Sequence, residues 1–215
     1  MAFEAKNILV GAAPLFLSNL DSTESTYTTV IPEGSNVSSY STASLYDEST
    51  KELKGALGSA YSNVGYTNNG LQITYNPTYG SVTVDQLLDT AKLFKESMEV
   101  MLATEFTEAT LANVVKVFGQ ETDSLASDVL SIAAGALGSE PTERQLIAIG
   151  LAPRNSANKK RERVYYARRV LSVQQSQFTL ARNTATTFPV TFRLLPDAAY
   201  AGAEYGKIID RVIES

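Results

Sequence analysis

The chain has 215 residues, of which 44% are hydrophobic and 19% charged, the composition of a folded globular protein and not of a disordered one. Acidic residues outnumber basic ones 23 to 18, and the net charge of −5 argues against a protein that coats nucleic acid by bulk charge. The sequence holds neither cysteine nor histidine, which excludes disulfide frameworks, thiol nucleophiles, Cys/His zinc sites and histidine-dependent triads.

The N-terminal part of the chain combines a short apolar run with a long polar stretch. Residues 8–17 are nearly all apolar, but a membrane span needs about 18 such residues, so this run predicts a buried strand that is broken at Pro14. Of the 33 residues from 18 to 50, 15 are Ser or Thr, a composition too polar to fill a core. We therefore expect a single domain over 1–215 with an extended arm or loop at about 18–65.

Apolar and polar residues alternate in four segments, which predicts half-buried strands of an antiparallel sheet. These segments are 71–76, 81–85, 94–103 and 187–194. In the third segment, Lys95, Ser97 and Glu99 would share the polar face. The run 164–173 is rich in β-forming residues and predicts a further strand.

One helix is predicted at about 107–118. Thr107 is a suitable N-cap residue, and Gly119 follows as a C-terminal stop. Between them, apolar residues recur at helical spacing and form one stripe that can pack on a sheet. Residues 125–137 fit either a helix or a short strand.

Charge is segregated along the chain. Residues 144–193 contain ten bases and one acid, Glu162, for a local charge of +9, which leaves −14 for the rest because the whole chain carries −5. Separate basic and acidic surfaces suit a molecule that binds copies of itself head to tail, in assemblies that weaken with ionic strength. The densest cluster, which we name the basic patch, consists of Lys159, Lys160, Arg161 and Arg163. We interpret it as an inter-subunit contact, with a hydrated loop, a nucleic-acid patch and a localisation signal as alternatives.

No pattern in the sequence predicts catalysis, a cofactor or a metal site. Carboxylates recur at short spacing in four pairs, the residue type that acid–base chemistry uses. The pairs are Asp85/Asp89, Glu96/Glu99, Glu105/Glu108 and Glu121/Asp123. None is set among aromatic sugar platforms, the chain has no Trp, and neither a phosphate-binding loop nor a G-x-S-x-G elbow occurs. We therefore expect solvated surface acids and a protein that is not an enzyme.

From residue 70 to about 206, the order of these segments resembles the phage major tail tube proteins. The stretches that carry the resemblance are Gly70–Tyr75, Val82–Gln86, Glu96–Ala103, Glu105–Asn113, Gln145–Gly150, Arg163–Arg168 and Phe188–Asp197. The resemblance implies a mainly β (α+β) fold, an antiparallel β-sandwich or half-barrel with one flanking helix. It also implies that 129–135 and 145–151 are paired strands.

The function that the resemblance implies is structural. Such subunits form hexameric rings that stack into a hollow tube, through which the viral DNA leaves the capsid without specific binding. The implied partners are further copies of the chain and other tail proteins: the tape measure, the tail terminator, the baseplate or tip and, in a contractile tail, the sheath. The implied location is the tail of the virion, assembled in the host cytoplasm without a membrane. The arm at 18–65 would bridge stacked rings.

A conduit for DNA should not bind DNA, because a duplex carries one negative charge per ~1.7 Å and every basic wall would slow it. Polar and acidic residues on the predicted sheet are therefore our candidates for the wall of the lumen. They are Gln72, Thr74, Thr83, Asp85, Ser97 and Glu99. Lys95, predicted on the same face, counts against this assignment unless a carboxylate neutralises it. An ordinary solvent-exposed sheet face is the alternative interpretation.

Two other functions stay open at the level of the sequence. A type VI secretion or tailocin tube protein would share the same physics and carry a different cargo. A carbohydrate-binding or hydrolytic tail protein would instead use the acidic pairs, as a monomer with affinity for glycans.

Overall fold

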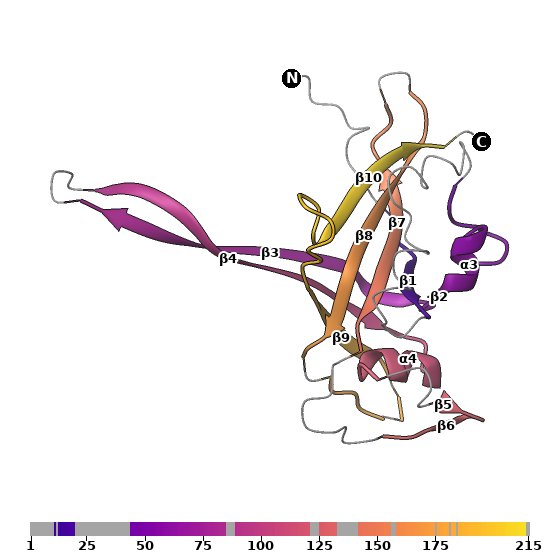
Figure 1. Ribbon diagram of the computed structural model, residues 1–215. Helices are drawn as coiled ribbons and strands as arrows, with labels where there is room; N and C mark the ends of the chain where they lie inside the picture. The colour runs from indigo at the N-terminus through magenta and orange to yellow at the C-terminus, as the bar shows by residue number, and fades with distance from the viewer. Residues whose placement is uncertain are drawn as a thin grey trace.

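A computed structural model of the chain describes residues 11, 13–19, 44–84, 89–120, 125–132, 142–155, 158–174, 176–180, 182–183 and 185–213. These residues form the mainly β fold that the sequence predicts, with one large antiparallel sheet, two helices and a separate two-stranded ribbon. Figure 1 shows a body from which one long hairpin projects.

The large sheet takes its strands from the whole length of the chain. Its order is β2 (Tyr61–Asn63), β1 (Leu15–Ser18), β7 (Arg144–Ala152), β8 (Arg161–Ser172), β9 (Phe188–Leu194), β4 (Thr90–Phe106) and β3 (Thr67–Thr83). The remaining strand, β10 (Gly206–Val212), lies off this path and pairs with β8. All neighbouring strands are antiparallel. The predicted strands at 94–103, 164–173 and 187–194 correspond to β4, β8 and β9.

One edge of β8 is shared by two strands, and this divides the sheet into two layers. β10 pairs with β8 over Arg161–Ala167, and β9 pairs with β8 over Val170–Ser172. In Figure 1, β7, β8 and β10 stand upright, while β3 and β4 run across the view at the height of β8 and β9 lies toward its lower end. This arrangement is compatible with the predicted sandwich or half-barrel.

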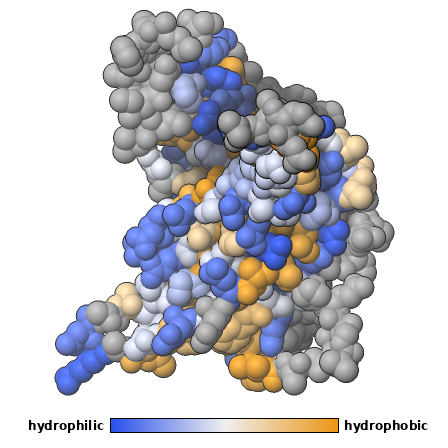
Figure 2. Space-filling model, turned by 90° about the vertical axis from the view of Figure 1, so that its left-hand side faces the viewer, coloured by the Kyte–Doolittle hydropathy of each residue, from blue (hydrophilic) through white to orange (hydrophobic). Residues whose placement is uncertain are grey.

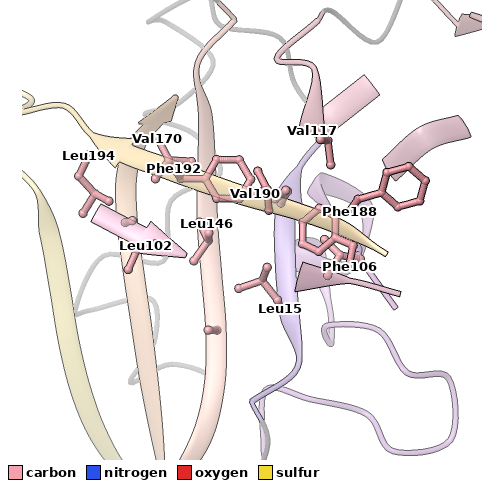
Figure 3. Close-up of a cluster of buried hydrophobic side chains, with 14 of the residues drawn as sticks. Leu15, Leu102, Phe106, Val117, Leu146, Val170, Phe188, Val190, Phe192 and Leu194 are labelled. Carbon is pink, nitrogen blue, oxygen red and sulfur yellow. The ribbon is translucent and has the colours of Figure 1, made fainter. Parts of the chain in front are cut away.

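Apolar side chains from both layers fill the space between them (Figure 3). Leu15 and Leu146 come from β1 and β7, and Leu102 and Phe192 come from β4 and β9. Phe106, at the end of β4, is completely buried in the same cluster. Burial of a side chain of this size contributes about 1.5–3 kcal/mol, so this cluster holds the two layers together.

The opposite face of the β1–β7–β8 layer is buried under residues 45–61. Strand alternation directs Phe16, Ile147 and Val164 to this side. The residues that cover them are Leu45, Leu53, Leu57, Ala60 and Tyr61, of which Leu57 and Ala60 belong to the short helix α3 (Ala56–Ala60). A strand buried on both faces reads as a continuous apolar run, as the sequence of β1 and of β7 does.

A buried ion pair fastens this covering segment to β8. The Glu162 carboxylate accepts hydrogen bonds from Ser44 Oγ at 2.7 Å and from the Leu45 N–H at 3.2 Å. Its other partner is Arg211 of β10, with the guanidinium 2.7 Å away and both side chains less than a tenth exposed. The predicted arm at 18–65 is therefore wrong for residues 44–65. The segment was predicted as an arm because its apolar residues are few and widely spaced, but these few are enough to cover a sheet face that is itself apolar. Residues 20–43 of that arm lie outside the described residues.

The predicted helix is shorter than expected and begins later. α4 covers Leu111–Val117, and its N-cap is Thr110, whose hydroxyl accepts a hydrogen bond from the Asn113 N–H at 3.3 Å. Thr107, the predicted N-cap, instead donates its hydroxyl to the Tyr66 carbonyl at 2.8 Å, close to the end of β4. Two candidate caps three residues apart cannot be ranked from local sequence alone.

The ambiguous segment at 125–137 contains a small ribbon. β5 (Leu125–Ala126) pairs with β6 (Val129–Leu130) across a turn in which Ser127 and Asp128 both have positive φ. The implied pairing of 129–135 with 145–151 is therefore wrong for the described residues. β7 is a strand, as expected, but its partners are β1 and β8. Residues 133–140 lie outside the described residues.

The most distinctive element is the hairpin formed by β3 and β4. Each strand has 17 residues, which corresponds to roughly 55 Å of extended chain. β9 pairs with β4 over Met101–Phe106, so the inner end of the hairpin belongs to the sheet of the body. The outer part extends far from the body (Figure 1). The two predicted strands at 71–76 and 81–85 are parts of the single long strand β3 and its C-terminal end.

Candidate assembly surface

The two sides of the β3–β4 hairpin differ in chemistry. Two residues that pair in register on neighbouring strands project to the same side of the hairpin. Tyr75 therefore lies beside Val100, and Asn76 lies beside Glu99. We name the first side the apolar face; it carries Ile73, Tyr75, Pro77, Tyr79, Leu93, Met98, Val100 and Leu102. We name the second side the polar face; near the body it carries Gln72, Thr74, Asn76, Thr78, Ser97, Glu99 and Met101, and farther out it carries Val82, Lys92 and Phe94.

The apolar face is buried near the body and exposed farther out. Val100 and Leu102 are less than a tenth exposed and belong to the core. By contrast, Tyr75 is 59% exposed, Tyr79 57% and Leu93 65%. Figure 2 views the molecule from the side that bears the hairpin and shows hydrophobic patches among hydrophilic residues on this side. A row of large apolar side chains on a projecting element is typical of an interaction surface.

A β-bulge changes the predicted position of Lys95. The register shifts at Glu96, the additional residue of β4, so the alternation of side chains is reversed beyond it. Lys95 therefore lies on the apolar face, with its ammonium 5.6 Å from the centroid of the Tyr75 ring and 2.9 Å from the Met98 sulfur. The prediction that Lys95 shares the side of Glu99 is wrong. The same shift places another base, Lys92, on the side of Glu99, opposite Val82.

The structure brings together most of the residues predicted to line the lumen. Those on the polar face are Gln72, Thr74, Ser97 and Glu99. Thr83 lies on the opposite side, because β3 alternates regularly and 83 is an odd-numbered position. Asp85 lies outside the described residues.

The polar face continues onto β9, where it carries a base. Arg193 of β9 pairs in register with Met101, which projects to the polar face. Its guanidinium Nε lies 3.5 Å from Glu99 Oε1, with the arginine side chain 50% exposed. The acidic residue and its neighbouring base therefore neutralise each other, and sequence reasoning had not placed Arg193 on this face.

The outer edge of β3 is open. β3 is the last strand in the sheet order, so one of its edges has no strand partner within the described part of the chain. Such an edge presents a row of backbone N–H and C=O groups that can pair with a strand of another chain. Pro77 lies in the middle of β3, a position that proline tolerates on an edge strand.

A groove lies where the hairpin joins the body. Its volume is about 170 Å³. The hairpin contributes Ile73, Val100 and Leu102 to the lining, and β8 with the start of β10 contributes Tyr165, Ala167, Tyr205, Lys207 and Ile208. The groove opens where β10 and β9 diverge along β8, so it is a direct consequence of the division of the sheet. Sequence analysis missed it, since its two walls are about a hundred residues apart in the chain.

The structure divides the basic patch into two parts. Arg163 forms a bidentate ion pair with Asp210, the residue opposite it on β10, with N···O distances of 2.5 and 2.8 Å. Arg161 lies 3.6 Å from the same carboxylate. The hydrogen bonds from Arg163 hold the pKa of Asp210 below its usual range. Two of the four bases therefore connect β8 to β10 within the chain.

The other half of the patch lies at the tip of the β7–β8 connection. Lys159 and Lys160 are exposed there and precede β8 directly. These two lysines are the part of the predicted inter-subunit contact that faces solvent.

The charge segregation seen along the sequence is partly removed in space. Arg169 forms a bidentate pair with Glu143 at 2.5 and 2.8 Å, and Arg211 binds the buried Glu162. Together with Arg163–Asp210 and Arg193–Glu99, these pairs join bases to acids that come from other parts of the sequence. Opposite charges far apart in the chain are thus paired within one molecule, which reduces the charge available for head-to-tail binding.

The carboxylates of the Glu105/Glu108 pair stabilise the fold. Glu105 Oε2 accepts hydrogen bonds from the side-chain amides of Asn68 and Asn69, at 3.1 and 2.8 Å. Glu108 accepts the Tyr66 N–H at 3.0 Å, and its carboxylate occupies the space that a Cβ of Gly65 would need.

Of the other acidic pairs, only Glu96/Glu99 lies wholly within the described residues. Glu96 lies against Gly80 and Glu99 pairs with Arg193, while Asp85, Glu121 and Asp123 lie outside the described residues. Among the residues that the structure describes, no cluster of three or more acidic side chains could hold a metal ion, and no helix is long and apolar enough to cross a membrane.

Comparison with protein-family models and with curated proteins finds no match to this chain.

Proposed function

We propose that this protein is the structural subunit of a phage tail tube, which assembles into stacked hexameric rings and forms the conduit for genome ejection. The observation that carries the proposal is the β3–β4 hairpin, which is incomplete as part of a lone molecule. One of its edges is open, and its apolar face is exposed over the outer half. A two-stranded ribbon is marginally stable in water by itself, so contacts with other copies would complete it.

The polar face supports the same proposal. Near the body it holds uncharged residues such as Gln72 and Thr74, and its charged pair, Glu99 with Arg193, is neutral as a unit; Lys92 lies on the same side farther out. The part of this wall near the body has little attraction for phosphate, which is what a channel for DNA requires. In the proposed tube, the polar face of the β9–β4–β3 layer lines the lumen, and the apolar face contacts neighbouring subunits.

The experiment is electron microscopy of the purified protein, combined with light scattering over a range of concentrations. We expect hollow six-fold rings or tubes whose fraction rises with concentration. A monomer that persists at high concentration, with or without other tail proteins, would contradict the proposal. So would rings that carry the polar face on their outer surface.

A type VI secretion or tailocin tube would use the same surfaces, so the structure fits this alternative equally well. The genes beside this one separate the two possibilities, because a genome conduit is encoded with capsid and DNA-packaging genes.

A further inference from the structure

The groove at the base of the hairpin is open, apolar and the size of one aromatic ring. An engineered cavity of about 150 Å³ lined by apolar residues binds benzene, and this groove has about 170 Å³. Ile73 and Ile208 stand on opposite walls, and Ile208 is 65% exposed. Apolar surface of this kind gains free energy when a side chain of matching shape fills it.

The hairpin of the same chain does not supply that side chain. Ile73 and Val100 belong to the hairpin and already form one wall of the groove. From there the paired strands extend away from the body in register as far as Thr83 and Thr90 (Figure 1). The outer residues of a continuous ribbon cannot return to the groove at its own base, whereas the hairpin of a second molecule can reach it.

The outer half of the hairpin carries a suitable side chain. Tyr79 and Leu93 lie diagonally across the two strands on the apolar face, and both are more than half exposed. In this part of the hairpin, all residues from 89 to 97 are exposed as well. Tyrosine prefers sites where its ring is buried and its hydroxyl stays near polar groups. The groove offers an apolar interior, with Lys207 in its lining.

We propose that Tyr79 of one copy's hairpin docks into the groove between β10 and the hairpin base of a second copy, with Leu93 packed beside it against the exposed Ile208. The occupant is a second copy of this chain, because the same molecule presents both the unfilled groove and the uncovered residues that match it. The contact is apolar, which suits copies that each carry a net charge of −5 and repel one another at long range. This inference rests on the proposed function, since it names the contact through which the subunits assemble.

Disulfide trapping tests the contact directly, because the natural chain has no cysteine. Copies with the single substitution Leu93→Cys are mixed with size-tagged copies carrying Ile208→Cys, and the mixture is oxidised. Both positions are exposed, so neither substitution should disturb folding. We expect the mixed dimer to be the main product. The control pairs Leu93→Cys with Leu180→Cys, an 81% exposed position outside the groove lining, and should give background cross-linking.

Two outcomes would overturn the proposal. Dimers formed mainly between two Leu93→Cys copies would mean that hairpins meet each other side by side. A mixed dimer no more abundant than the Leu180→Cys control would mean that the groove has another occupant or none. If rings or tubes form under either outcome, the proposed function stands and this contact is wrong; if no oligomer forms, both are wrong.

A second measurement uses tyrosine substitutions of equal size. Tyr79→Ala should raise the concentration needed for assembly by about tenfold or more, as expected for a buried aromatic anchor. Tyr66→Ala is the matched control, because Tyr66 is 80% exposed and lies outside the groove lining, and it should change that concentration less than about twofold. Tyr79→Phe should assemble nearly as the natural chain does. Equal effects of Tyr79→Ala and Tyr66→Ala would contradict the docking of Tyr79.

Discussion

At the scale of single residues, several polar side chains of this protein connect segments that are distant in the sequence. Arg163 and Asp210 fix the pairing of β8 with β10, and Glu162 fastens the segment at Ser44 to β8. Lys116 of α4 is a different case. Its ammonium donates to Ser62 Oγ at 2.5 Å, but the side chain is almost completely buried. Burial of a charge that is not fully compensated costs stability.

The titration of Lys116 gives a prediction about stability. The pKa of Lys116 is lowered from 10.5 to about 8, mainly by burial and also by the nearby Arg144, while Glu52 opposes the shift. Between pH 8 and 10.5 the folded protein has lost this proton while the unfolded chain keeps it, so unfolding takes up a proton and stability rises with pH. Below pH 8 the charge on Lys116 makes the free energy of unfolding about 3 kcal/mol lower than it is above pH 10.5.

Lys116→Met should therefore stabilise the protein at pH 7, by about 1–3 kcal/mol once the lost hydrogen bond to Ser62 is counted. The gain should vanish near pH 10.5. Urea denaturation at pH 7, 9 and 10.5 measures the difference between the two proteins, with Lys160→Met as a control at an exposed lysine. If the difference in free energy of unfolding between the two proteins does not depend on pH, the charge on Lys116 does not destabilise the fold.

At the scale of elements, the hairpin and the body contribute differently to stability. The inner part of β4 supplies Val100, Leu102 and Phe106 to the core. The outer part of β4, residues 90–97, is exposed and pairs with β3. Folding of the body should therefore not depend on the outer half of the hairpin, whereas assembly should depend on it.

A shortened variant separates these two roles. Residues 78–97 are replaced by an Asn-Gly turn, which suits a two-residue hairpin connection. We expect a folded monomer whose midpoint of thermal unfolding stays within a few degrees of that of the natural chain, because no core residue is removed. Circular dichroism and light scattering measure folding and oligomeric state. A shortened protein that still forms rings would place the assembly contacts elsewhere.

At the scale of the whole molecule, pairing of charges within the chain changes how the basic patch should be tested. Charge reversal at Arg161 and Arg163 would break the contact with Asp210 and so destabilise the fold itself. Lys159 and Lys160 are the better targets, because they are exposed at the end of the β7–β8 connection.

Lys159→Glu with Lys160→Glu should slow assembly a fewfold at low ionic strength if the patch steers one subunit toward another. The effect should fade above about 0.5 M salt, where surface charges are screened within a few ångströms. Turbidity or light scattering at two salt concentrations measures it, with thermal unfolding as a control for folding. An assembly rate unchanged at low salt would show that the patch takes no part, without affecting the apolar contact of Tyr79.

The sequence by itself determined several of the strands and which face of each is apolar. Alternation in β4 and β9 and the β-rich run of β8 are local signals, because each depends on neighbouring residues and a period of two. It also determined, from composition, that neither a cysteine nor a histidine can act in this protein.

Only the tertiary structure decided which residues meet. The side of Lys95 depends on one extra residue in β4, and a register shift of this kind leaves no sign in the alternation read from one strand. The covering of β7 by residues 45–61, the pairing of Arg163 with Asp210 and the groove beside Ile208 all join segments far apart in the chain. Local patterns fix which face of an element is apolar, but contacts between distant segments are fixed by how the complete chain packs.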